Sequence, residues 1–257
     1  MRFQVAYHTD IGREKSTNQD SLGVLEANTD EGRLLLAVLC DGMGGLDKGE
    51  VASAALIRAF EAWFQEELPG LIRKEDPLYE VRFSWERMIK VQNQSIGDYG
   101  RSRRIQLGST LTAMLFLEDG SYLIGHVGDS RAYLIRQEVL EILTSDQTVV
   151  ANEVRLGKLT PEQAASDPRK NVLLQCIGAS GFVEPEFREG KAVPGECYLL
   201  CSDGFRHELS EEELLTALTP EKSPDEETMR RNLEKLTWRN LERGERDNIS
   251  ALLLKIL

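Results

Sequence analysis

Four aspartates each stand at one end of an apolar run that has the length of a buried strand. They are Asp41 after residues 34–40, Asp129 after 122–128, Asp203 after 198–202, and Asp247 before 249–257. A carboxylate at such a position is costly to bury unless a cation neutralises it, and hard divalent cations prefer carboxylate and carbonyl oxygens. We therefore expect these strand ends to converge on one oxygen-rich site. For Asp41 alone, an Asp-Gly turn that closes a strand pair is the alternative.

The chemistry that suits several carboxylates is hydrolysis assisted by two metal ions. The chain has three histidines and no CxxC pair, which disfavours an imidazole-rich site and a zinc site. It has neither a GxxxxGK[ST] phosphate loop nor a GxSxG nucleophile elbow. Paired Mg²⁺ or Mn²⁺ ions about 3.5–4 Å apart can polarise a phosphoryl group and activate a bridging water. Their charge also offsets the charge on the transferring phosphoryl group.

A polar loop from Asp10 to Asp20 carries two cations, Arg13 and Lys15. It ends in Asp20, shortly before the apolar stretch 22–25. We interpret it as an anion-binding loop beside the metal site. A surface turn without such a role is the alternative.

The composition restricts the classes of partner. A net charge of −12 disfavours nucleic acid, which needs a basic footprint, and simple electrostatic binding to anionic membranes. No apolar run approaches the ~20 residues of a transmembrane helix, and the N-terminus lacks the apolar region of a signal peptide. We therefore expect a cytoplasmic protein. No linker rich in Pro, Gly or Ser divides the chain, so we expect one domain, residues 1–257. We also expect a monomer.

Strands and helices are expected in blocks along the chain. The expected strands are 3–8, 34–40, a β-meander over 109–143 around the hairpin signal Asp119-Gly120, paired strands over about 182–202, and 249–257. One helix is expected from near Asp47 to Pro69-Gly70, and others over about 78–96, 146–157 and 160–165. Capping boxes at Thr160, Ser210 and Ser223 mark helix starts, and Gly244 marks the end of the last helix. Hairpin signals outnumber crossover units, which favours an α+β fold with antiparallel sheets.

Six short motifs occur in a recognisable order. They are Asn18-Gln19-Asp20, Asp41-Gly42-Met43-Gly44-Gly45, Gly108-Ser109-Thr110, Gly128-Asp129-Ser130-Arg131, Ser202-Asp203-Gly204 and Asp247-Asn248. The order resembles the metal-dependent protein phosphatases, the type 2C or PPM serine/threonine phosphatases, over nearly the whole chain from about residue 12 to 257. Each motif is weak alone, whereas six in order are specific. Met43 is more similar to bacterial members than to animal ones, which usually carry His there.

The resemblance implies a four-layer α-β-β-α sandwich of two antiparallel sheets flanked by helices. It implies a binuclear Mn²⁺ or Mg²⁺ centre in the cleft between the sheet edges. By this likeness Asp41 bridges both ions and the Gly42 carbonyl binds one of them. Asp203 and Asp247 hold the other. The water bound to the ions, rather than a side chain, attacks the phosphorus.

Two further residues are implied around this centre. Asp20 acts behind the ligands or through water. In bacterial relatives a third, weaker ion uses residues that match Asp129 and Asp203. The segment 148–171 matches the variable flap beside the family's active site, for which a surface helical hairpin without that role is the alternative.

Three residues depart from the family pattern. Lys15 stands where the family carries its phosphate-binding Arg, and a lysine cannot make the bidentate fork of an arginine. We expect Lys15 to serve with weaker substrate binding, or Arg13 to take the role. Gln19 replaces the usual Glu, and Met43 cannot act as the general acid that His can provide elsewhere.

Two histidines remain as candidate acids. For His126, a satisfied histidine in a sheet is the favoured interpretation. His207 follows the Asp203 loop at a position where relatives often carry Asp, so a role in the site is the alternative to a structural one.

The resemblance predicts hydrolysis of phosphoserine and phosphothreonine in proteins, with Asp41, Asp203, Asp247 and Lys15 as the catalytic set. Phosphorylated proteins are the expected partners, together with a cognate serine/threonine kinase. A phosphatase-like binding module with little turnover is the main alternative, because of the departures at Lys15, Gln19 and Met43. A two-metal hydrolase of small phosphoesters is a third hypothesis.

Overall fold

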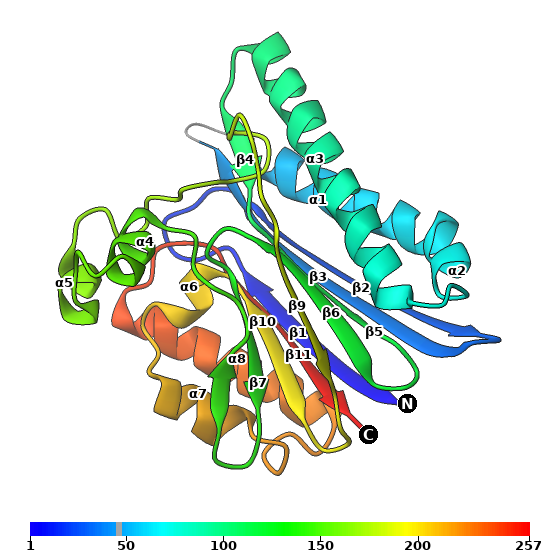
Figure 1. Ribbon diagram of the computed structural model, residues 1–257. Helices are drawn as coiled ribbons and strands as arrows, with labels where there is room; N and C mark the ends of the chain where they lie inside the picture. The colour runs from blue at the N-terminus through cyan, green and yellow to red at the C-terminus, as the bar shows by residue number, and fades with distance from the viewer. Residues whose placement is uncertain (45–47) are drawn as a thin grey trace.

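The computed structural model describes residues 1–44 and 48–257. Its strands form two antiparallel sheets that lie face to face (Figure 1). The five-stranded sheet has the order β1-β11-β10-β7-β8, with β1 at Phe3–Asp10, β11 at Ile249–Ile256, β10 at Cys197–Cys201, β7 at Arg131–Ile135 and β8 at Leu140–Ile142. The six-stranded sheet has the order β2-β3-β5-β6-β9, with β2 at Asp20–Thr29, β3 at Gly32–Gly44, β5 at Leu111–Phe116, β6 at Ser121–Val127 and β9 at Glu186–Lys191, while β4 (Leu107–Ser109) pairs with β3.

Helices cover the outer face of each sheet (Figure 1). The six-stranded sheet carries α1 (Gly49–Glu66), the one-turn α2 (Leu68–Leu71) and α3 (Pro77–Arg103). The five-stranded sheet carries α6 (Asp203–Arg206), α7 (Glu211–Leu218) and α8 (Glu226–Arg243). The short helices α4 (Val149–Arg155) and α5 (Pro161–Ser166) lie apart from both helical layers, near α6.

Three separate groups of buried side chains hold these layers together. Trp63 and Trp85 pack in the group between the six-stranded sheet and its helices. Phe116 and Tyr198 meet between the two sheets, with ring centroids 5.1 Å apart. Leu233 belongs to the group between the five-stranded sheet and α8. The predicted four-layer α-β-β-α sandwich is therefore confirmed.

The apolar run at 34–40 shows why such a strand lacks a polar face. Successive side chains of a strand point to opposite faces of the sheet. In β3, Leu35, Ala37 and Leu39 face the other sheet, whereas Leu34, Leu36 and Val38 face the helices. Both faces are buried, so the residues of this strand do not alternate between apolar and polar.

The prediction that residues 109–143 form one meander is wrong. β5 and β6 pair in the six-stranded sheet, whereas β7 and β8 pair in the five-stranded sheet. The chain passes between the sheets just after β6, where Gly128 has φ of 113° in the left-handed region. Turn residues mark where the chain changes direction, but they do not specify which sheet the next strand joins.

The predicted pairing of strands within 182–202 is wrong for the same reason. β9 pairs with β6, and β10 pairs with β7 and β11. The turn between them joins the two sheets: the Ala192 N–H donates to the Gly120 carbonyl at 2.8 Å, and the Gly195 N–H donates to the Ile256 carbonyl at 2.9 Å.

Several helix boundaries differ from the prediction. The first helix ends at Glu66, so Pro69 and Gly70 lie in the separate turn α2 rather than at its end. Its predicted start near Asp47 lies outside the described residues. The second helix continues to Arg103, seven residues beyond the predicted end at 96.

The capping signals were correct in two of three places. Capping boxes form at Thr160 and Ser210, and Gly244 ends α8 with φ of 98°. The box predicted at Ser223 is wrong, because α8 is capped by Asp225, whose side chain accepts from the Thr228 N–H at 2.8 Å. In the described part of the chain, no helix combines the length and apolarity needed to cross a membrane.

Candidate active site

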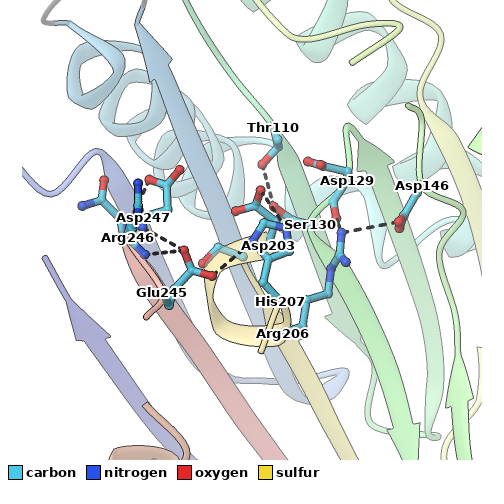
Figure 2. Close-up of polar contacts among 12 residues, drawn as sticks. Thr110, Asp129, Ser130, Asp146, Asp203, Arg206, His207, Glu245, Arg246 and Asp247 are labelled. Carbon is cyan, nitrogen blue, oxygen red and sulfur yellow. Dashed lines mark hydrogen bonds and ion pairs between the residues drawn. The ribbon is translucent and has the colours of Figure 1, made fainter. Parts of the chain in front are cut away.

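The aspartates at the strand ends come together at one end of the sandwich. Asp20 and Asp41 are register partners on β2 and β3 of one sheet. Asp203 is the first residue of α6, directly after β10, and Asp247 lies just before β11 of the other sheet. Antiparallel pairing of β10 with β11 explains why residues so far apart in sequence approach each other here. Figure 2 shows Asp203, Asp129 and Asp247 from these elements.

Burial first, and mutual repulsion after it, raise the pKa values of three of these aspartates. Loss of hydration, with the charges of Asp20 and Asp203 next, raises the pKa of Asp41 well above its usual range. Burial and the charge of Asp203 raise the pKa of Asp20 to about 7, and the same two causes raise the pKa of Asp129 to about 7. One pKa unit corresponds to about 1.4 kcal/mol, so several ionised carboxylates here oppose one another strongly.

The donor atoms of this cluster fit hard divalent cations. Both carboxylate oxygens of Asp20 and one of Asp203 are buried without a hydrogen-bond partner in the described part of the chain. Oxygen donors of this type and charge are those that Mg²⁺ and Mn²⁺ prefer. Within residues 1–44 and 48–257, however, no three His, Cys, Asp or Glu side chains already form a ligand cage. The carboxylate oxygens would therefore have to draw together around an ion.

The backbone of Asp41 is held by hydroxyl groups from the neighbouring strands. The Thr110 hydroxyl accepts from the Asp41 N–H at 3.0 Å, and the Ser109 hydroxyl donates to the Asp41 carbonyl at 3.0 Å. Ser130 lies 2.8 Å from the Thr110 hydroxyl and so extends this support to the turn after β6 (Figure 2). These contacts explain the Gly-Ser-Thr and Gly-Asp-Ser motifs.

Gly42 must be a glycine because backbone approaches it from two sides. A Cβ atom at Gly42 would lie 2.4 Å from the Gln19 carbonyl oxygen and 2.4 Å from the Gly49 carbonyl oxygen. Its N–H donates to that Gln19 carbonyl at 3.2 Å. There is therefore no room for a side chain at the residue after Asp41, whose carbonyl is the ion ligand that the resemblance implies.

The cationic loop before β2 is fixed to the other sheet by Asn248. The Asn248 side chain accepts from the Gln19 N–H at 2.9 Å and donates to the carbonyls of Ile11, at 2.9 Å, and Thr17, at 3.2 Å. Asn248 is itself buried. The Asp-Asn motif therefore supplies both a carboxylate and an anchor for the loop that carries Lys15.

Of the two candidate phosphate ligands, Lys15 lies beside the carboxylates. Its Nζ atom is 2.8 Å from Asp247 Oδ1. Burial disfavours its charge, but the hydrogen bond and the charge of Asp247 outweigh this and raise the pKa of Lys15. Arg13 is exposed and makes no hydrogen bond or ion pair through its side chain within the described residues. Its proposed role stays a prediction.

A pocket of about 340 Å³ opens over these residues. It is lined by Lys15, Gln19, Asp41, Gly42, Met43, Gln106, Leu107, Gly108, Cys176, Ala179 and Asp247. A phosphoryl group in this space would meet the ammonium group of Lys15 and the carboxylate of Asp41. All three positions that depart from the family pattern thus line the same pocket.

Sequence reasoning missed a charged network beside Asp129. Arg131 makes a bidentate ion pair with Asp146, with both N–O distances at 2.7 Å. Arg206 lies 3.4 Å from Asp146 and donates to the Asp129 carbonyl at 3.0 Å (Figure 2). Asp146 stands four residues after the end of the short strand β8, behind Thr144 and Ser145, so the signal used for the four aspartates does not extend to it.

The helices of the predicted flap border this side of the site. A hollow of about 690 Å³ is lined by Val150 and Val154 of α4, Ala164 of α5, and Asp129 and His207. The segment 148–171 therefore lies next to the carboxylate cluster, although its role stays a prediction.

His126 is a satisfied histidine of the sheet, as predicted. Nε2 donates to the Gly128 carbonyl at 3.1 Å, so Nδ1 is the acceptor and takes the Thr112 hydroxyl at 3.0 Å. The ring is fully buried. Burial lowers its pKa, against the opposing charges of Glu186 and Asp146.

This lowered pKa predicts a loss of stability in weak acid. As pH falls through about 6.5, the unfolded chain binds a proton at this histidine that the folded chain does not bind. The free energy of unfolding should therefore fall more steeply between pH 7 and 5.5 in the wild type than in His126→Gln, by up to about 1.4 kcal/mol per pH unit. Urea titrations at several pH values measure both slopes, and parallel slopes would contradict the prediction.

His207 contacts the carboxylate cluster, which favours a role in the site. Its Nε2 atom lies 3.5 Å from Asp203 Oδ2, and its Nδ1 atom lies 3.2 Å from Glu245 Oε2 (Figure 2). Sequence reasoning did not single out Glu245. Its signal is weak, since the sequence does not distinguish a buried glutamate two residues before Asp247 from an exposed one.

Comparison with known proteins agrees with this geometry. The family model described as Protein phosphatase 2C matches residues 10–249. A putative protein phosphatase 2C-type of Streptococcus pyogenes is 33% identical over 254 residues, which cover 98% of this chain and 97% of that protein.

Solved structures lead to the same family. The S. agalactiae serine/threonine phosphatase superposes with a TM-score of 0.87 at 31% identity, covering 100% of both chains. The catalytic domain of the serine/threonine protein phosphatase PstP, in complex with two manganese ions, superposes with a TM-score of 0.78 at 30% identity, covering 98% of this chain and 97% of that one. Because both the family model and these relatives span nearly the whole length, this chain belongs to the protein phosphatase 2C family.

Proposed function

We propose that this protein hydrolyses phosphoserine and phosphothreonine in phosphorylated proteins, using two Mn²⁺ or Mg²⁺ ions. The observation that carries the proposal is the cluster of buried, mutually repelling carboxylates beside a pocket that also holds Lys15. Family membership supports the reaction class, and the two manganese ions in the PstP structure support the cofactor. The substrates would be the products of a serine/threonine kinase, and we propose that the protein acts as a monomer.

In this proposal Asp41 would hold both ions, and the Gly42 carbonyl would hold one of them. Asp203 and Asp247 would hold the other ion, and Asp20 would act behind these ligands or through water. Asp129, with Asp203, would serve a third ion. The ions, when bound, supply an activated water and offset the charge of the phosphoryl group.

The chain's own residues bind and orient the phosphate. Lys15, whose ammonium group lies 2.8 Å from Asp247, would be released when Asp247 holds an ion and would then pair with the phosphoryl oxygens. Asn248 keeps the Lys15 loop in place during this exchange, through its three hydrogen bonds. Met43, at the rim of the pocket, has no proton to donate.

The test is phosphate release from a phosphoserine or phosphothreonine peptide with Mn²⁺, with and without a chelator. We expect turnover that the chelator abolishes and excess Mn²⁺ restores. Equal rates with and without chelator would reject the proposal. Mn²⁺ binding without turnover of any phosphopeptide or of p-nitrophenyl phosphate would favour the binding-module alternative, for which the Lys15–Asp247 contact is the motivating observation. Turnover of p-nitrophenyl phosphate alone would favour a hydrolase of small phosphoesters.

The placement of Lys15 predicts its effect on substrate binding. Lys15→Ala should raise KM for a phosphopeptide by about 10- to 100-fold, because a hydrogen bond to a charged group contributes about 1.5–3 kcal/mol. Lys15→Arg should lower KM, since its guanidinium can bind phosphate with two parallel bonds. Arg13→Ala, in the same loop, is the matched control and should change KM less than twofold. The reverse order of the two alanine variants would assign the phosphate to Arg13.

A further inference from the structure

A buried glutamate and a histidine lie between Asp203 and Asp247, the two aspartates that are proposed to hold the same ion. Glu245 lies in the turn before β11 and is 8% exposed. Its Oε1 atom accepts from the backbone N–H groups of Arg246, at 2.7 Å, and Asp247, at 2.9 Å. Its Oε2 atom accepts from His207 Nδ1 at 3.2 Å. The carboxylate therefore binds three donors at once and organises the turn that presents Asp247.

His207 extends this connection to Asp203, which follows the neighbouring strand β10 of the same sheet. It caps the C-terminal end of α6, where its N–H donates to the Asp203 carbonyl at 3.0 Å. Its Nε2 atom, on the side of the ring away from Glu245, faces Asp203 Oδ2 at 3.5 Å. Figure 2 shows Asp247, Glu245, His207 and Asp203, the four residues of this connection.

We propose that Glu245 and His207 are positioning residues that set the spacing between Asp203 and Asp247 for ion binding. The inference rests on the proposed function for the identity of the ion site. Neither residue is assigned as a ligand, and each acts through the aspartate next to it.

The physical reason is that the two aspartates come from separate elements and repel each other. Asp203 begins α6, whereas Asp247 belongs to the turn before β11, and one oxygen of Asp203 is buried without a partner among residues 1–44 and 48–257. A donor and acceptor pair that joins both elements limits how far the carboxylates can separate before an ion arrives. Carboxylate–imidazole pairs behind metal ligands orient them, and removing such partners typically costs 10- to 100-fold in affinity or activity.

The experiment measures Mn²⁺ binding to the metal-free protein by isothermal titration calorimetry. We expect Glu245→Ala and His207→Ala each to weaken Mn²⁺ binding by about 10- to 100-fold. Glu245→Gln keeps an oxygen acceptor for the two backbone N–H groups and should recover much of the affinity. The double variant should bind Mn²⁺ no more weakly than the single variant with the lower affinity, because the losses at two residues that act as one unit do not add.

Glu213→Ala is the matched control. Glu213 also holds several donors, since it accepts from Arg239 at 2.9 Å, from Arg243 at 2.7 Å and from the Ser210 N–H at 3.0 Å, but it lies at the start of α7. Its loss should leave Mn²⁺ affinity unchanged within twofold. Wild-type affinity in Glu245→Ala, additive losses in the double variant, or the same loss in Glu213→Ala would each overturn the proposal.

The result does not depend on turnover. If the wild type has no phosphatase activity but the variants lose Mn²⁺ affinity as expected, the positioning role is supported and the proposed phosphatase reaction is rejected. Wild-type protein that binds no Mn²⁺ would reject the ion site and this inference together. Circular dichroism of each variant shows whether it is folded, and Glu245→Gln provides a test if Glu245→Ala does not fold.

Discussion

Asp203→Ala is expected to lower kcat/KM for a phosphopeptide by about 1,000-fold or more, because ions bound at this carboxylate are proposed to supply several kcal/mol of transition-state stabilisation. The side chain is nearly buried, and one of its oxygens has no partner among the described residues. Removing it therefore breaks few contacts within the protein. The expected loss is one of ion binding rather than of folding.

The sign of the stability change separates these two explanations. Asp203 raises the pKa values of Asp20, Asp41 and Asp129, so it repels its neighbours when no ion is present. The metal-free variant should then be at least as stable as the metal-free wild type. The wild type should gain about 2.7 kcal/mol from Mn²⁺ at 100 times its Kd, whereas the variant should gain much less.

Thermal unfolding with and without Mn²⁺ measures the stability, and phosphate release measures the activity. Asp98→Ala removes an exposed aspartate whose partner is Arg101 on the same helix, and it is the control for loss of one negative charge. Activity of Asp203→Ala within tenfold of the wild type, or an equal thermal shift with Mn²⁺, would show that Asp203 is not an ion ligand.

Asn248→Ala is expected to reduce both stability and substrate binding. The substitution leaves one backbone N–H and two carbonyls of the 11–19 segment without their partner. Each buried group left in this way costs about 1–3 kcal/mol, so we expect a loss of about 2–4 kcal/mol once water reaches some of them. Since the same segment carries Lys15, KM for a phosphopeptide should rise about tenfold.

Asn232→Ala is the matched control for this variant. Asn232 also ties down backbone, through carbonyls of Ala217 at 3.0 Å and Lys222 at 2.8 Å, but it belongs to α8 on the outer layer. It should lose stability without a change in KM. Urea unfolding and steady-state kinetics of both variants give the comparison, and a normal KM in Asn248→Ala would mean that the loop holds its position without this anchor.

Much of the architecture could be predicted from local sequence. The unbroken apolar run at 34–40 indicated a strand buried on both faces, and β3 is such a strand. Capping signals at Thr160 and Ser210 located helix starts because a cap is formed by residues three apart in the chain. The order of six motifs led to the family, and the family model and relatives agree with it.

The assembly of strands into sheets required the three-dimensional structure. Local turn signals around Gly128 and Gly195 are the same whether the next strand pairs with the previous one or joins the opposite sheet. The choice depends on which face each apolar side chain can bury, and so on partner strands that lie 60 to 70 residues away in the chain. For this reason the pairings of β7 and β9 were not predictable from their own residues.

The site divides in the same way. Residue type and position at a strand end were enough to select Asp41, Asp203 and Asp247, because a carboxylate there is costly without a cation. Nothing local distinguishes Arg206 or Glu245 from ordinary polar residues, and the Asp247-Asn248 motif gave no sign that Asn248 anchors the loop of Lys15. Their significance lies in contacts with groups far away in the chain: Asn248 with the Gln19 N–H at 2.9 Å, Arg206 with the Asp129 carbonyl at 3.0 Å, and Glu245 with His207 at 3.2 Å.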